Sequence, residues 1–165
     1  MMGPRTHRGF ARLRRLLLGS VLLAVLNVAF AALFLTETVT PSLGLVLAGA
    51  SGRQFILNTD ETVSGANAAD YLVGAVSGQL EVKQTGGPAS GTILADNITA
   101  TPGVTVNAIP CRWHNDPQAR CDLGGITAAL QATRILYVGV DITTSQVHSD
   151  GDMEIVTYDI TVSIP

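Results

Sequence analysis

The chain has 165 residues, of which 14% are charged and 47% are hydrophobic, with a formal net charge of −3. This length fits one ordinary domain. The apolar content excludes a disordered chain, and the lack of a basic excess argues against a nucleic-acid-binding protein. The charge is unevenly distributed. Five arginines precede residue 16 in a segment without an acidic residue. Residues 32–165 contain five basic and all 13 acidic residues and therefore carry a net charge of −8.

The N-terminal segment has the order of a secretory signal. A basic stretch up to Arg15 precedes an almost wholly apolar run, and the small residues Ala29 and Ala31 fit a cleavage site directly after residue 31. We therefore predict a signal helix over residues 1–31 that is removed. The alternative is a retained anchor, since residues 16–35 are long enough to span a bilayer. Both interpretations place the rest of the chain outside the cytoplasm, in the periplasm, at the cell surface or secreted, and only the retained anchor would contact the membrane.

The remainder is expected to consist of an extended N-terminal arm over residues 32–42 and a single domain over residues 43–165. Short runs rich in β-branched residues recur in the domain about every 8–12 positions, with turn-forming residues between them, which is typical of a sandwich or barrel. The upstream strand candidates are residues 43–47, 53–58, 80–84, 92–95 and 104–109. Residues 124–133 contain helix formers for one or two turns, behind two glycines. We therefore expect an all-β antiparallel sandwich of about seven or eight strands.

The last two strand candidates have the clearest pattern. Apolar residues alternate strictly with polar ones over residues 156–164, and residues 134–143 alternate in the same way. This period of two is expected for strands with one buried face. The intervening Ser-Asp-Gly-Asp at residues 149–152 indicates a turn. We therefore predict that residues 134–143 and 153–164 form an antiparallel pair.

The two cysteines, Cys111 and Cys121, lie close together in the segment CRWHNDPQARC. In an exported protein, such an isolated pair predicts a disulfide. A metal site formed by the two cysteines and His114 is disfavoured, because the spacing lacks the paired C-x-x-C pattern and an oxidising compartment favours the bridge. Trp113 has two interpretations: the favoured one is that it packs the loop onto the sandwich, and the other is that it is an exposed anchor for a partner or a sugar.

The sequence offers no motif for catalysis. A nucleophilic hydrolase needs a Ser, a His and an acid within mutual reach, but neither His114 nor His148 accompanies a G-x-S-x-G motif. Residues 148–152 gather polar groups without the D-x-[DN]-x-[DN]-G order of a calcium loop. Asn97 begins a short match to the N-glycosylation acceptor. We therefore predict a non-enzymatic protein with no catalytic residues, no metal ligands and no cofactor.

Three segments carry a resemblance to a known family. They are GLVLAGASGRQFILNTDETVSGA, SGQLEVKQTGG and RILYVGVDITTSQVHSDGDMEIVTYDITVSIP. Over most of residues 41–165 the chain resembles the bacterial domain-of-unknown-function family 4402. The segment between the cysteines and the final Ile164-Pro165, where an aromatic residue is more usual, depart from the family pattern. The resemblance implies a secreted immunoglobulin- or pilin-like sandwich at the cell surface, without catalytic residues.

Two functional hypotheses follow. The first is a structural or adhesive surface protein, such as a pilin-like subunit that assembles by strand addition with copies of itself or with a periplasmic chaperone. Its contact residues would be the alternating side chains of the last strand and an N-terminal arm that is donated to another copy: Tyr158, Ile160, Val162, Ile164, Phe34 and Leu35. The alternative is a secreted monomeric binding module that uses Trp113 and the Cys111–Cys121 loop. A periplasmic enzyme ranks below both, and no nucleic-acid partner is expected.

Overall fold

The structure, a computed structural model, describes residues 32–47, 51–130, 133–145 and 155–165. The predicted signal segment, His148 and the predicted turn at residues 149–152 lie outside the described residues. The described residues are all-β, as predicted, and the strands that pair run antiparallel. Fourteen strands are found among them, together with one short 3-10 helix, η1 (Ala68–Asp70). Strands outnumber the seven or eight expected because long strands are divided between sheets and several pairings extend over only two residues.

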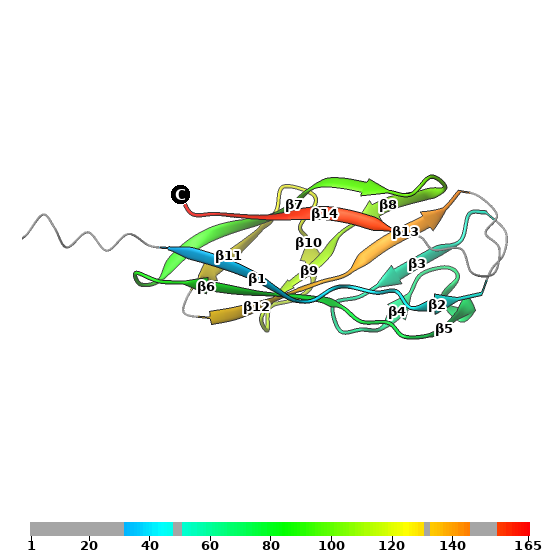
Figure 1. Cartoon of the computed structure of the whole chain (residues 1–165), viewed down its shortest axis with the longest axis horizontal. Helices are drawn as coiled ribbons and strands as arrows, with labels where there is room; N and C mark the ends of the chain where they lie inside the picture. Colours follow the sequence, from blue (N-terminus) through cyan, green and yellow to red (C-terminus); the bar gives the residue numbers. More distant parts are fainter. Residues whose placement is uncertain (1–31, 48–50, 131–132, 146–154) are drawn as a thin grey trace, which may run out of the picture. The chain divides into compact units, whose positions relative to one another are not determined.

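Two sheets form the main body of the domain (Figure 1). The five-stranded sheet has the order β1 (Leu33–Val39), β6 (Gly78–Gln84), β12 (Thr133–Val138), β9 (Pro110–Trp113) and β10 (Ala119–Arg120). The three-stranded sheet has the order β11 (Ile126–Leu130), β7 (Ala89–Ala100) and β14 (Val156–Ser163). Consequently β1 and β14 are edge strands of different sheets, and in Figure 1 they extend along the same side of the domain.

Two smaller sheets complete the domain. One has the order β4 (Val63–Ser64), β3 (Gln54–Leu57), β13 (Val140–Thr144) and β8 (Val104–Ala108). The other pairs β2 (Leu45–Val46) with β5 (Tyr71–Val73). Only Ile109 separates β8 from β9 and only Gly139 separates β12 from β13, so these two segments each pass from one sheet to the next.

The predicted strand over residues 134–143 is therefore divided at Gly139. A Cβ atom at this position would lie 2.0 Å from the carbonyl oxygen of Leu57, which is closer than any side chain tolerates. The Gly139 N–H instead donates to the Pro110 carbonyl over 2.8 Å. Glycine is required here because the backbone of another segment approaches this residue closely.

The predicted antiparallel pair between residues 134–143 and 153–164 is wrong. Strand β14 pairs with β7, with Ile160 opposite Ala95 and Val162 opposite Ile93, whereas β13 pairs with β3 and β8. An alternating pattern identifies the buried face of a strand but not its neighbour. Two such patterns that follow each other in the sequence can therefore belong to different sheets.

The segment considered for helical turns, residues 124–133, contains strand β11 instead. Gly124 and Gly125 precede it with φ of 77° and 76°, a left-handed conformation that favours glycine. Behind these glycines, Ala128 and Leu130 face the core at 1% exposure each. Burial against the neighbouring strand outweighs the helix propensity of the alanines.

The core lies between the two main sheets. Its fully or almost fully buried side chains come from both: Ile93, Ala95, Ala128 and Leu130 from the three-stranded sheet, and Val82, Cys111, Trp113, Leu136 and Val138 from the five-stranded sheet. Two antiparallel sheets that share one core are consistent with the predicted β-sandwich.

Candidate functional site

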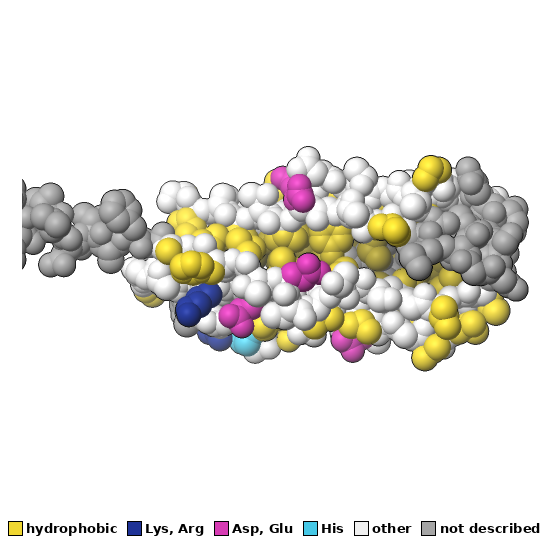
Figure 2. Space-filling model, viewed as in Figure 1, with side chains coloured by type: hydrophobic (Ala, Val, Ile, Leu, Met, Phe, Trp, Pro, Cys, Tyr) yellow, Lys and Arg dark blue, Asp and Glu magenta, His cyan; other side chains and the backbone are white. Residues whose placement is uncertain are grey.

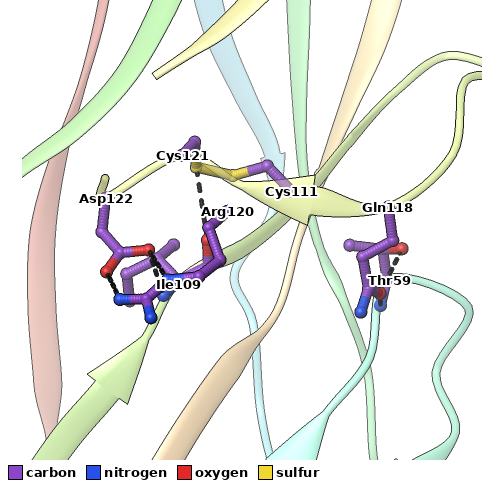
Figure 3. Close-up of a disulfide and its surroundings, with 7 residues drawn as sticks. All are labelled: Thr59, Ile109, Cys111, Gln118, Arg120, Cys121 and Asp122. Atoms are coloured by element: carbon purple, nitrogen blue, oxygen red, sulfur yellow. Dashed lines mark hydrogen bonds and ion pairs between the residues drawn. A yellow bond between two sulfur atoms is a disulfide. The ribbon is translucent and has the colours of Figure 1, made fainter. Parts of the chain in front are cut away.

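The predicted disulfide between Cys111 and Cys121 is present (Figure 3). The Cα atoms are 5.8 Å apart, and both cysteines are fully buried. The Cys121 N–H donates to the Ile109 carbonyl over 3.1 Å, and the Cys121 carbonyl accepts from the N–H of Ala95 on β7 over 2.8 Å. The bridge and these bonds tie the five-stranded sheet to the middle strand of the facing sheet, so the role of the cysteines is structural.

Polar contacts hold the loop between the cysteines on both sides (Figure 3). The Asp122 carboxylate accepts from the Arg120 guanidinium and from the Ile109 N–H. Burial raises the pKa of Asp122, but these hydrogen bonds outweigh it, and the pKa lies below its ordinary value. On the other side, Gln118 Oε1 accepts from the N–H and the hydroxyl of Thr59 over 2.9 and 2.8 Å. Gln118 and Arg120 of this loop are thus engaged with neighbouring residues of the domain.

Trp113 belongs to the core. Its side chain is packed with the disulfide and the central strands, and the residue is only 5% exposed. The neighbouring Arg112 stacks over the ring of Tyr137, 4.3 Å from its centroid, and donates to the Thr59 carbonyl. The packing interpretation of Trp113 is therefore the correct one, and the buried indole is not available as an anchor for a partner.

The described part of the chain contains no group of three or more His, Cys, Asp and Glu side chains arranged to hold a metal ion. Cys111 and Cys121, the two cysteines of the disfavoured metal site, are bonded to each other in the disulfide. None of the described residues belongs to a helix that is long and apolar enough to cross a membrane.

The predicted N-terminal arm is extended and forms strand β1, which pairs with β6 of the same chain. Leu35 lies opposite Val82, a residue of the core. Directly opposed residues point to the same face of a sheet, so Leu35 and Glu37 lie on the inner face and Phe34 on the outer face. Exposure of 54% for Phe34 and 40% for Leu35 shows that this edge strand is only loosely covered.

The outer side of β14 is open, since among the described residues only β7 pairs with this strand. Ile160 and Val162 lie opposite Ala95 and Ile93, which are 2% and 0% exposed. Yet the inner row of β14 is only half-buried, although it faces the same core. This row consists of Tyr158, Ile160, Val162 and, just beyond the strand, Ile164.

The inner rows of these two edge strands form what we call the edge seam: Leu33, Leu35 and Glu37 from β1, and Tyr158, Ile160, Val162 and Ile164 from the C-terminal end. Figure 2 shows a band of hydrophobic side chains on this side of the domain, between β14 and β1. Burial, and then the negative charge of Glu37, raise the pKa of Tyr158 to about 12. The seam is therefore an apolar surface that contains a single carboxylate.

The sequence predicted five of the seven seam residues, because alternation identifies the inner face of β14 and the mixed apolar and polar arm contains the apolar residues Phe34 and Leu35 near its start. Leu33 and Glu37 were missed. The alternation of Leu33, Leu35 and Glu37 places them on one face, but the arm was expected to be unpaired in its own chain, and nothing local indicates that it adds to β6.

Comparison of the chain with protein families, curated proteins and solved structures found no match. The resemblance to the family 4402 therefore stays a prediction, and the functional argument rests on the geometry of the edge seam.

Proposed function

We propose that the chain is an exported, non-enzymatic structural or adhesive protein of the cell exterior, an immunoglobulin- or pilin-like sandwich that associates by addition of a strand to β14. The observation that carries the proposal is the open edge of β14, eight residues long, beside a half-exposed apolar row. A free edge presents unpaired backbone N–H and C=O groups to any strand of suitable pattern.

The composition of β14 supports this use of its edge. Natural proteins protect exposed edge strands with lysine, proline, bulges or inward-pointing charges. Residues 156–163 contain no lysine and no proline, and Asp159 is their single charge. The pairing with β7 shifts register between Thr157 and Asp159 and is regular from Asp159 to Ser163. Asp159 lies among the exposed residues of the strand, where its carboxylate accepts from the Asn97 amide over 2.8 Å. The inner row thus carries no charge that would repel an added strand.

The location outside the cytoplasm is supported by independent features. A buried disulfide is typical of oxidising compartments, and the N-terminal segment has the order of an export signal. The net charge of −8 over residues 32–165 favours solubility and disfavours contact with anionic lipid or nucleic acid.

The experiment introduces a charge into the inner row of β14 and compares it with the other edge of the same sheet. Val162 and Ile126 are both half-buried and lie opposite Ile93 from its two sides, on β14 and β11 respectively. Val162→Lys should abolish association of the exported protein, measured by light scattering and by cross-linking in intact cells. Ile126→Lys removes similar packing and should leave association intact.

Circular dichroism and thermal melting would establish that both variants remain folded. Association that is equally strong in the wild type and in Val162→Lys would overturn the proposal. So would a wild type that stays monomeric and is cross-linked to nothing in cells.

A further inference from the structure

We propose that the strand added to β14 is β14 of a second copy, so that two chains form a symmetric dimer with one continuous six-stranded sheet made of two three-stranded sheets. This inference rests on the proposed function and names its partner and its geometry. Symmetric dimers of this kind use the same surface on both subunits, which must therefore be complementary to itself.

Strand β14 meets this condition. When a strand pairs with its own copy about a two-fold axis, one central residue lies opposite itself, and residues at equal distances on either side lie opposite each other. Directly opposed residues point to the same face, so the apolar row always meets the apolar row and the polar row meets the polar row. The half-exposed row of Tyr158, Ile160 and Val162 would thereby gain a neighbouring row of the same chemistry.

Of the two residues at the middle of the strand, Asp159 and Ile160, the side chains favour Ile160 as the central residue. A centre at Asp159 would place two carboxylates directly opposite each other, which is destabilising. A centre at Ile160 places Asp159 opposite Thr161 and Tyr158 opposite Val162, an aromatic and β-branched pair that stabilises antiparallel strands. This register also extends from Val156 to Ile164 and so uses the whole length of the strand.

The competing donor is the N-terminal arm, which is β1 in this structure. It already pairs with β6 over Leu33–Val39 of its own chain. Insertion of a second arm into the edge seam would also add a second Glu37 to a seam that already holds one, and like charges repel. The inner row of β14 brings no charge. The electrostatics of the seam therefore favour a second β14 over a second β1.

Single cysteines test the register, because both native cysteines are bonded to each other. Opposed residues in neighbouring strands have Cβ atoms close enough for a disulfide after small adjustments. In the exported protein, Ile160→Cys should form a cross-linked dimer on mild oxidation, and the uncross-linked wild type should have twice the monomer mass in light scattering. Val162→Cys is the matched control: alone it should remain uncross-linked, but mixed with Tyr158→Cys it should form a heterodimer.

Failure of this inference is distinguishable from failure of the proposed function. If Val162→Lys abolishes association but Ile160→Cys does not cross-link, another segment adds to β14 and the symmetric dimer is refuted. A ladder of higher oligomers would likewise refute it in favour of head-to-tail addition. If Val162→Lys changes nothing and no cysteine variant cross-links, both the dimer and strand addition at β14 are refuted.

Discussion

Reduction of the Cys111–Cys121 bridge should lower the free energy of unfolding by about 2.8 kcal/mol. The cysteines are 10 positions apart, so the bridge closes a loop of about 11 residues. The chain-entropy relation for a loop of this size gives about 2.8 kcal/mol at 25 °C, through the wider range of conformations open to the reduced unfolded chain. The two sulfur atoms remain in the core after reduction, and the packing around them is therefore preserved.

The assay is urea unfolding of the oxidised and the reduced protein, followed by fluorescence. Trp113 is the single tryptophan of the chain and is buried beside the bridge, so its emission reports the core directly. With an unfolding slope of about 1.5–2.5 kcal/mol/M for a domain of this size, the midpoint should decrease by about 1–2 M. Reduction is preferable to replacement of both cysteines by alanine, which would add the effect of a cavity.

A decrease of less than about 0.3 M in the midpoint would refute this reasoning. It would mean that the bridge does not restrict the unfolded chain to the extent that the chain-entropy relation requires. Retained native fluorescence in the reduced protein, at a lower urea midpoint, is the expected pattern. Loss of the fold on reduction without urea would show that the bridge contributes more than loop closure.

Three further predictions concern individual side chains. Between about pH 9 and about pH 11, the free energy of unfolding should fall by about 1.4 kcal/mol more in the wild type than in Tyr158→Phe. The fold raises the pKa of Tyr158 from 10.0 to about 12, so in this range the phenol ionises mainly in the unfolded chain. Urea unfolding at several pH values measures the difference. Asp122→Asn should lessen the loss of melting temperature on acidification below the ordinary pKa of 3.8, since the carboxylate is stabilised in the fold and its contribution disappears on protonation. Gly139→Ala should destabilise by about 2 kcal/mol in thermal melts, because its Cβ would meet the Leu57 carbonyl oxygen.

Each of these predictions has a control and a contradicting result. An equal alkaline loss in Tyr158→Phe would show that other groups cause it, whereas Glu37→Gln should reduce the difference only in part. Identical acid profiles of the wild type and Asp122→Asn would contradict the stabilised carboxylate. For Gly139, Gly87→Ala serves as a reference for backbone strain alone, because Gly87 has a φ of 105° and an added Cβ there meets no atom within 4 Å. A destabilisation of Gly139→Ala below about 0.5 kcal/mol would refute the steric argument.

The strand content and the buried face of the last strand could be predicted from the sequence. Alternation between Val156 and Ile164 determines which side chains face inward, because the period of a strand is a local property of the backbone. The disulfide could also be predicted, because the chain has only two cysteines and an exported protein favours a bond between them. The close approach of the backbone at Gly139 could not be predicted, because the contact joins Gly139 to Leu57, which is far away in the sequence.

What the sequence determined by itself was therefore local. It determined the strand character of the chain, the inner row of β14 and the pair of cysteines. It also distinguished a basic N-terminal segment from an acidic remainder. Only the tertiary structure decided which strands are neighbours. It placed β14 on β7 rather than beside residues 134–143, added the arm to β6, buried Trp113 and brought Glu37 toward Tyr158. Many pairings satisfy the same alternating pattern, and the choice among them depends on how all inner faces are covered together. The edge that remains open after this choice is the one from which we infer association.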